Sequence, residues 1–473
     1  MNVVFIAIDA LRADRLGCYG YDRPTSPFID SLAAEGVVFD NHFAPVVPTQ
    51  PAFTSIFTGA GPLRTGVVAH EGRYAPNPNC IWLPAVLKQL DYHTVSVDNL
   101  ADHKPWFWRG FEYYINPRKR GDFPDCHAFN ERTVEWLTHT RREPFFMHLH
   151  FWDPHTPYLP KREHMLSFYQ GDPTTTNVGS LDPFYDRPQV ERWPKTWFGT
   201  LLEQWPDTQG PRIEDKDFIC AMYDAEVRTA DDGVREVVET LERQGILDDT
   251  LIFIFGAHGE ELAGQHGIWF DHHGLYDSNI RVPMIMYWPK GLGGGRRVSA
   301  MTQHPDIAAT VIDLLGKQVP EVVDGQSMLP LARGEKETSH WNHTLMTCES
   351  TWQCKWAMRT PEYKLIVSRE PDYHEKPPVE LYDLLADPGE LTNIVNDNAD
   401  LTRTLLTRFD LLLKSMLEQR GLKQDPIATH GLTLGRRMFE RLGRPYPPPR
   451  NGWKGHPVPA LAGARPSRAA AKA

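Results

Sequence analysis

Three residues far apart in the sequence, Asp9, Thr49 and His258, are of types that together can bind a cation and attack an ester. Asp9 and His258 each follow a short apolar run, and Thr49 stands just before a segment with helical character. Carboxylate and imidazole groups bind divalent cations, and an alcohol bound to such a cation becomes a usable nucleophile at neutral pH. Each residue alone has a structural explanation, such as a turn or a helix cap. The motifs around the three residues decide between these structural explanations and a metal-dependent hydrolytic site.

The elements around these residues are typical of an open α/β sheet. Residues 2–8 form a buried strand that ends at Asp9, and residues 250–255 form another. Open α/β sheets bind their ligands at the carboxyl ends of the strands. A helix over residues 51–58 would turn its positive end toward an anion beside Thr49. Further expected elements are a strand over 144–152, a helix over 223–245, a strand over 282–287 and a helix over 305–315.

The stretch 48–59, Pro-Thr-Gln-Pro-Ala-Phe-Thr-Ser-Ile-Phe-Thr-Gly, resembles the signature of the sulfatase family, which belongs to the alkaline-phosphatase superfamily. Thr49 stands where that family places the Cys or Ser that is oxidised to formylglycine, and Phe53 stands where it places arginine. Threonine cannot undergo this oxidation. The nucleophile therefore resembles that of the threonine-using phosphodiesterases and of the phosphonate monoester hydrolase branch.

The resemblance implies a set of metal ligands. Asp9 matches the first ligand, whereas the adjacent acid of sulfatases is Ala10 here. The family motif Asp-His-Gly-Glu is matched at His258 and the two residues after it, but Ala257 stands at the position of the expected Asp ligand. The implied metal site is therefore Asp9, Thr49 and His258, with Ala257 marking a missing carboxylate.

Two explanations of Ala257 stay open. In the first explanation, an aspartate at position 257 was replaced by alanine, which inactivates the site. In the second, the chain is a natural member of the family with a weakened site. Since the other motifs are intact, we interpret the chain as an Asp-to-Ala inactivated form. The oxygen and imidazole ligands favour Mn or Zn as the divalent metal, and Ca or Mg are compatible as well.

The resemblance also assigns roles beside the metal. His155, within residues 151–158, takes a general-acid or substrate-binding role, and the nearby Asp153 could tune its imidazole or bind substrate. Sulfatases carry a Gly-Lys-x-His motif whose slots here are Asn99 and Ala101, so Asn99 is a substrate-binding candidate.

A cationic Lys of sulfatases falls near His272 or His273, and both histidines are catalytic candidates. With Phe53 and Asn99 at positions that are cationic in sulfatases, much of the fixed positive charge is gone, yet an anionic transition state still needs compensation. His272 and His273, with Asp271 and His155, could supply it by binding a second metal or by donating hydrogen bonds. We therefore expect Thr49, His155, His272 and His273 to be catalytic.

The overall composition is that of a globular protein. The 473 residues are 41% hydrophobic and 23% charged, which favours a large α/β domain plus a smaller one. The formal net charge of -11 argues against a nucleic-acid partner. No apolar run is long enough to span a bilayer, and the N-terminus enters a strand without signal-peptide features. We expect a cytoplasmic protein with reduced cysteines that does not bind membranes.

The resemblance covers most of residues 2–395 and implies the fold and the domain organisation. The expected fold is α/β, with a large mixed, mostly parallel sheet sandwiched by helices and a small C-terminal α+β subdomain. The expected domains are a catalytic domain over 1–335 with an irregular lid at 161–215, a C-terminal subdomain over 336–425, and an extended tail over 426–473. The end of that tail is expected to be disordered, and the tail suggests a homo-oligomer, a dimer or tetramer.

Three functions compete. The first is hydrolysis of phosphodiesters or phosphonate monoesters through a covalent phospho-threonine, with a small anionic ester as the substrate. The second is a sulfatase that acts without formylglycine. The third is a catalytically dead binding homologue, which the loss of functional groups at Ala10, Phe53 and Ala257 would favour.

Overall fold

The computed structural model describes residues 1–72, 75–117, 125–175, 179–186, 194–205, 208–341, 343–371, 374–441, 443, 445 and 456. Within these ranges the central sheet has the strand order β10-β2-β9-β7-β1-β6-β4-β5, and β8 pairs with β2. Its strands are β1 (Asn2–Ile8), β2 (Val37–Phe43), β4 (His93–Val97), β5 (Tyr113–Ile115), β6 (Phe145–Phe151), β7 (Thr250–Gly256), β8 (Arg281–Val282), β9 (Met284–Tyr287) and β10 (Arg296–Gln303). β1 pairs in parallel with both β6 and β7, whereas β9 is antiparallel to its neighbours β7 and β2. The expected mixed, mostly parallel sheet is confirmed.

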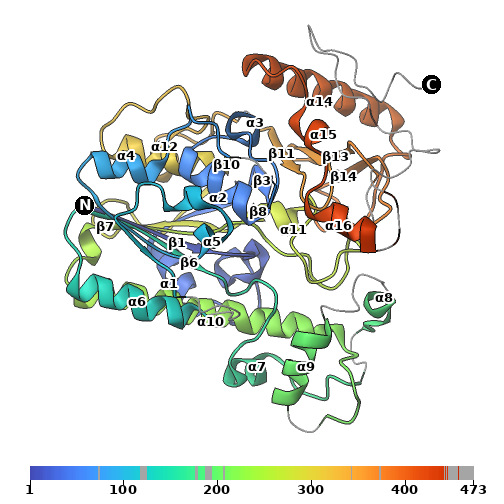
Figure 1. Ribbon diagram of the computed structural model, residues 1–473, viewed down its shortest axis with the longest axis horizontal. Helices are drawn as coiled ribbons and strands as arrows, with labels where there is room; N and C mark the ends of the chain where they lie inside the picture. The colour runs from blue at the N-terminus through green and yellow to red at the C-terminus, as the bar shows by residue number, and fades with distance from the viewer. Residues whose placement is uncertain are drawn as a thin grey trace.

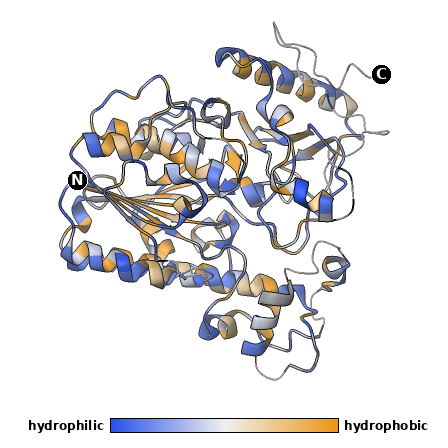
Figure 2. Cartoon of the chain, viewed as in Figure 1, coloured by the Kyte–Doolittle hydropathy of each residue, from blue (hydrophilic) through white to orange (hydrophobic). Residues whose placement is uncertain are grey.

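Helices cover both faces of this sheet (Figure 1). One face carries α2 (Thr49–Thr58), α4 (Leu83–Gln89) and α12 (Pro305–Leu314), and the other carries α1 (Pro27–Glu35), α6 (Cys126–His139) and α10 (Lys216–Arg243). Alternate residues of β1 enter the two cores, because successive side chains of a strand point to opposite faces. Phe5 packs in the α2 core and Ile6 in the α10 core. The apolar strands stand out at the centre of the molecule in Figure 2.

The expected elements are present with small differences. The helix expected over 305–315 is α12, and the strand expected over 282–287 is divided by Pro283 into β8 and β9. The helix expected over 223–245 begins earlier, at Lys216, where the Asp215 carboxylate accepts a hydrogen bond from the Asp217 amide and caps the helix.

A second sheet of five strands lies beside the first, in the order β14-β13-β12-β11-β3. It consists of β3 (Val46–Val47), β11 (Leu345–Glu349), β12 (Lys355–Arg359), β13 (Tyr363–Ser368) and β14 (Val379–Asp383), and α14 (Ala399–Gln419) packs against it. Strands β11 to β14 are antiparallel, as the resemblance implied. The strand β3 comes from the segment just before Thr49 and pairs in parallel with β11.

Two regions differ from expectation. The lid is not irregular where it is described, because it contains α7 (Arg162–Phe168), α8 (Asp182–Tyr185) and α9 (Pro194–Gln204). Tyr169, Trp205 and Phe218 pack edge to face there and join the core, so burial of aromatic rings replaces the periodicity that the sequence lacks. The described start of the tail is helical rather than extended, with α15 (Pro426–His430) and α16 (Leu434–Arg441). The end of the tail lies outside the described residues, except for residues 443, 445 and 456.

The remaining short helices are α3 (Pro62–Thr65), α5 (Leu100–His103), α11 (Asp277–Ile280) and α13 (Leu329–Ala332). Among the described helices, none combines the length and the apolar character needed to cross a membrane. The six cysteines are free thiols, as expected, and Cys348 and Cys354 form no disulfide.

Asp231 on α10 is expected to make stability depend on pH. Its buried carboxylate accepts hydrogen bonds from the amides of Phe28 and Ile29 at the start of α1. Burial nevertheless raises its pKa from 3.8 to about 6. The folded state binds the proton of Asp231 more tightly than the unfolded state does. The protonated carboxyl therefore stabilises the fold fully below pH 3.8, and this stabilisation is lost as the pH rises through about 6.

Raising the pH from 4 to 7 should therefore destabilise the unsubstituted protein relative to Asp231→Asn. The difference between their unfolding free energies should change by on the order of 3 kcal/mol in favour of the variant. Urea unfolding of both proteins at each pH measures this difference. The exposed Asp248 is the matched control, since Asp248→Asn should leave the difference flat. A flat difference for Asp231→Asn as well would contradict the prediction.

Candidate active site

The carboxyl ends of three adjacent strands bring the predicted ligands together. In the register of the sheet, Ile8 of β1 lies beside Phe151 of β6 and Gly256 of β7. Asp9 and His258 therefore emerge at the same edge. Helix α2 begins at this edge, with Thr49 as its first residue. The positive end of α2 thus lies at the nucleophile candidate.

Asp9, Thr49 and His258 form a compact triangle of buried polar atoms. Thr49 Oγ1 lies 3.2 Å from Asp9 Oδ2 and 3.1 Å from His258 Nε2. His258 Nε2 lies 3.0 Å from Asp9 Oδ1. All three side chains are at most 2% exposed. The structure therefore brings together the three residues that the sequence analysis grouped.

The orientation of His258 leaves Nε2 facing the triangle. Its Nδ1 lies 2.8 Å from the carbonyl oxygen of Gly259, which can only accept a hydrogen bond, so Nδ1 carries the proton. In the neutral ring Nε2 then presents a lone pair toward the carboxylate of Asp9. Two acceptors this close need a proton or a cation between them. A backbone carbonyl that fixes the distal nitrogen is also the usual support of a metal-binding histidine.

These three donors fit a divalent cation. Donor atoms bound to one tetrahedral metal at 2.0–2.1 Å lie about 3.3 Å apart, close to the 3.0–3.2 Å found between Asp9, Thr49 and His258. Burial by itself would raise the pKa of Asp9, but positive charge at the His258 position and the approach of His150 outweigh it and hold the pKa well below its usual value. Asp9 is thus an anionic ligand at neutral pH.

Ala257 leaves the fourth position without a side-chain donor. The residue is fully buried, and its carbonyl oxygen accepts a hydrogen bond from His304 Nε2 at 2.8 Å. At the other expected acid position, Ala10 has a φ of 54°, the left-handed conformation that is uncommon for residues other than glycine. The backbone at both positions is therefore well defined while the carboxylates are absent.

His150 is a site residue that the sequence prediction missed. It lies on β6, and its Nε2 is 3.5 Å from Asp9 Oδ2, whereas His258 contacts Asp9 Oδ1. Both of its ring nitrogens are buried without a hydrogen-bond partner among the described residues. The signal was present in the sequence, because His148 and His150 alternate within an otherwise apolar strand and so share one face.

Phe53 explains how that face is filled. Its ring centroid lies 4.6 Å from that of His150 and 5.4 Å from that of His148. An arginine at this position, as in sulfatases, would place a charge here, whereas Phe53 provides only an apolar edge. The sequence predicted a loss of fixed positive charge at Phe53, and in the structure His148 and His150 pack against this ring.

His155 and His272 lie together beside His258. Their ring centroids are 4.5 Å apart, and the ring of His272 stacks on that of His258 at 5.0 Å. His155 Nδ1 donates to the carbonyl of Thr156 at 2.6 Å, which leaves Nε2 as a lone pair. Burial lowers the pKa of His155, so the ring is neutral near pH 7. It can accept a proton at Nε2.

His273 points elsewhere. Its Nδ1 lies 3.2 Å from Asp271 Oδ1, and its Nε2 lies 2.8 Å from His374 Nε2. His272 Nδ1 lies 3.5 Å from the same Asp271 oxygen, so the two histidines approach this carboxylate together. Only the ring of His272 also lies against His155, at 4.5 Å between centroids, so the second metal site expected from the sequence stays a hypothesis.

The two substrate-binding candidates also differ. Asn99 is buried, and its amide oxygen accepts a hydrogen bond from Trp152 Nε1 at 2.7 Å. Its amide group lies beside the Trp152 ring, whose centroid is 4.8 Å from that of His155. Asp153 instead accepts a hydrogen bond from the Cys126 amide at the start of α6. Its carboxylate does not tune His155, whose Nδ1 is occupied by a backbone carbonyl.

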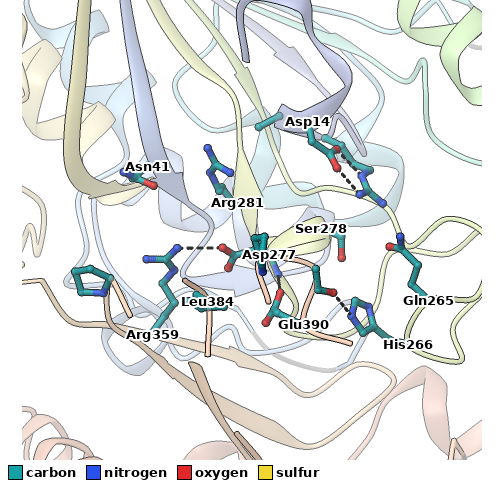
Figure 3. Close-up of a pocket in the computed structure, with 15 residues that line it drawn as sticks. Asp14, Asn41, Gln265, His266, Asp277, Ser278, Arg281, Arg359, Leu384 and Glu390 are labelled. Atoms are coloured by element: carbon teal, nitrogen blue, oxygen red, sulfur yellow. Dashed lines mark hydrogen bonds and ion pairs between the residues drawn. The ribbon is translucent and has the colours of Figure 1, made fainter. Parts of the chain in front are cut away.

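A cavity of about 460 Å³ lies elsewhere, between the first sheet and the C-terminal region (Figure 3). Its charged walls are largely paired, with Arg12 bound to Asp14 at 2.6 Å and Arg359 to Asp277 at 3.1 Å. None of the described residues that line it is a predicted site residue. Its volume alone does not make it the active site, and Asp9, Thr49 and His258 are not among its lining residues.

Comparison with protein families gives two matches. The sulfatase family model matches residues 1–317, and the model of the N-sulphoglucosamine sulphohydrolase C-terminal region matches residues 264–415. Among curated proteins, the chain is 24% identical to an N-acetylglucosamine-6-O-sulfatase of Bacteroides thetaiotaomicron, over 83% of this chain and 82% of that protein. It is 25% identical to a choline-sulfatase of Rhizobium meliloti, over 86% of this chain and 85% of that protein.

Two solved structures share the fold. One, determined with its substrate D-glucosamine-2-N,6-O-disulfate, superimposes with a TM-score of 0.70 and 22% identity, over 90% of this chain and 99% of the other. The other is the phosphonate monoester hydrolase of Agrobacterium radiobacter, with a TM-score of 0.66 and 20% identity, over 89% of this chain and 96% of the other. Structures similar to this chain therefore include enzymes named for sulfate esters and for phosphonate esters.

Proposed function

The chain belongs to the sulfatase family of the alkaline-phosphatase superfamily, a family of metal-dependent ester hydrolases, and on that premise we propose that it hydrolyses phosphodiesters or phosphonate monoesters with Thr49 as the nucleophile. One observation carries this proposal. Thr49 Oγ1 lies within 3.2 Å of both Asp9 and His258, at the first residue of helix α2.

Asp9, His258 and Thr49 would hold the divalent cation, with Mn or Zn favoured by the oxygen and imidazole ligands. Such a cation lowers the pKa of a bound alcohol and stabilises negative charge on the ester oxygens. The carboxylate of Asp9 orients the Thr49 hydroxyl by accepting its hydrogen bond. The amide dipoles at the start of α2 favour an anionic group at the same place.

The proton transfers fall to His155. Its neutral ring has a free Nε2, which can take the proton that Thr49 releases and return it to the leaving oxygen. Thr49 Oγ forms a bond to phosphorus as the bond to the leaving oxygen breaks. Water then attacks phosphorus, the bond to Thr49 breaks, and the Thr49 hydroxyl is restored. His272, 4.5 Å from His155 between ring centroids, is placed to bind the ester oxygens.

A phosphoryl group suits this nucleophile better than a sulfuryl group. A formylglycine hydrate releases sulfate when its hemiacetal collapses, and threonine has no such route. A covalent sulfo-threonine would have to wait for direct attack by water. Phe53, which packs against His150, also stands in place of the arginine that lies beside formylglycine in sulfatases.

Hydrolysis of sulfate esters without formylglycine is the second candidate. Its specific support is the naming of the relatives, since the curated proteins described above are named as sulfatases. The Asn99 amide beside Trp152 could donate a hydrogen bond to a sulfate oxygen as well as to a phosphate oxygen.

The test compares two esters in the presence of Mn²⁺ and of Zn²⁺. The chain with Ala257, which we interpret as an Asp-to-Ala inactivated form, and its Ala257→Asp variant would be assayed with bis(4-nitrophenyl) phosphate and with 4-nitrophenyl sulfate. Preferential cleavage of the phosphodiester supports the proposal, and preferential cleavage of the sulfate supports the second candidate. If neither protein binds metal or cleaves either ester, the chain is a catalytically dead binding homologue, for which the absent groups at Ala10, Phe53 and Ala257 would be the reason.

A further inference from the structure

A second group of potential metal ligands lies next to the nucleophile, at His70, Glu71 and His103. One donor atom from each residue lies within 4.8 Å of the other two. Two imidazoles and one carboxylate form a ligand set that binds Zn²⁺ in proteins, with water in the fourth position. Donors around a tetrahedral ion lie about 3.3 Å apart, so the three groups need to approach by at most about 1.5 Å to bind one.

The segment that carries His70 and Glu71 is held in place from several directions. The amide of His70 donates to Thr351 Oγ1 at 2.8 Å, and its carbonyl accepts from Thr433 Oγ1 at 2.7 Å. The amide of Glu71 donates to Gln50 Oε1 at 2.9 Å. These contacts involve the backbone and the supporting side chains and do not engage the carboxylate of Glu71.

The third ligand is tied to the same segment. Lys104, which follows His103 at the end of α5, donates from Nζ to the carbonyl of Gly72 at 2.6 Å. The ring centroids of His70 and His103 are 5.6 Å apart. The two stretches that provide ligands are thus joined by a direct contact, so their spacing does not depend on a free loop.

One ring nitrogen of His70 is left without a hydrogen-bond partner among the described residues. This nitrogen, Nδ1, is buried. A buried ring nitrogen left without a partner costs about 1–3 kcal/mol. A cation bound at this cluster would satisfy such a nitrogen and offset the cost.

The cluster is adjacent to the catalytic triangle through Gln50. This residue follows Thr49 directly, and its side chain reaches both the Glu71 amide and the ring of His70, the latter at 3.4 Å. Phe53 and Asn99 stand at two positions that are cationic in sulfatases, so this chain offers an anionic substrate less fixed positive charge there. A second cation here would supply the missing charge.

We propose that His70, Glu71 and His103 bind a second divalent cation of the zinc class beside the ester-binding site. This is a different place from the one that the sequence suggested, around Asp271, His272 and His273. Binding of the cation stands on the cluster itself, whereas its role in neutralising the substrate rests on the proposed function.

The test measures metal binding without substrate, in the full-length protein whose first site is disabled by His258→Ala. Zn²⁺ bound after equilibrium dialysis, and the visible absorption of bound Co²⁺, are the two readouts. We expect one equivalent of Zn²⁺ and a Co²⁺ spectrum of tetrahedral intensity. Adding His70→Ala or His103→Ala should weaken binding about 100-fold or more, since a direct ligand is lost.

Two further variants keep the experiment decisive. Glu71→Gln preserves shape and should also weaken binding, which guards against an unfolded alanine variant. His127→Ala removes a histidine on α6 that lies in neither cluster and should change nothing. The proposal is overturned if the His258→Ala protein binds no metal, or if its metal survives both His70→Ala and Glu71→Gln. Neither result depends on ester hydrolysis, so the proposed function would stand or fall separately.

Discussion

Thr49→Val is expected to lower kcat for the preferred ester by about 10⁴-fold, because loss of a covalent nucleophile removes the main reaction path. Valine keeps the volume and branching of threonine and removes only the hydroxyl that contacts Asp9 and His258. Steady-state kinetics with bis(4-nitrophenyl) phosphate measure the effect. Trapping of the phosphorylated protein at low pH, followed by intact mass measurement, would locate the covalent group.

The control for this variant lies one turn further along the same helix. Thr54 is also fully buried, and its hydroxyl donates to the carbonyl of Gln50. Thr54→Val should lose some stability but retain most of kcat. Thr49→Ser keeps a hydroxyl and should retain much of the rate. Full activity of Thr49→Val would exclude Thr49 as the nucleophile and would leave a water molecule to attack the ester directly.

Ala257→Asp is expected to raise metal affinity and kcat/KM each by about 100-fold or more, because it adds a charged ligand directly to the metal. The new carboxylate would follow Gly256 at the end of β7, next to His258. Asp9 would then no longer be the only carboxylate among the ligands. Isothermal titration with Mn²⁺ and Zn²⁺, together with the ester assays, measures both effects.

The matched variant here is Ala257→Asn, which has nearly the same shape as aspartate and no charge. It should gain little affinity, which separates charge from added volume in a fully buried position. A protein that unfolds on Ala257→Asp without metal but is stabilised by it would still support the prediction. Unchanged metal affinity in a folded Ala257→Asp protein would mean that Ala257 does not occupy a ligand position.

The triangle was predictable from sequence for a definite reason. Strands buried on both faces read as apolar runs whose carboxyl ends meet at one edge, which placed Asp9, and the resemblance to the Asp-His-Gly-Glu motif identified His258 as its partner. His150 was hidden because it lies inside such a run rather than after it. The distinction between His272 and His273 follows only from the local direction of the chain.

The other differences arise from long-range contacts. His70 is positioned by Thr351 and Thr433, hundreds of residues away, and no local pattern announces such a contact. The helices of the lid region are stabilised by aromatic packing against α10, which single-sequence periodicity does not reveal. Local sequence patterns therefore located the site residues at the ends of the strands. The residues that surround them are set by long-range packing, which those patterns do not show.

The pairing of β3 with β11 has a consequence for how the protein matures. Val46 and Val47 lie beside Cys348 and Glu349, and the segment leads directly to Thr49. During synthesis, Asp9, Thr49 and His258 all leave the ribosome before β11 exists. A nascent chain that ends before Leu345 would hold every residue of the triangle but would lack the strand that fixes the approach to the nucleophile. We therefore expect a chain truncated before Leu345 to leave the segment before Thr49 without its strand partner and to show little ester hydrolysis.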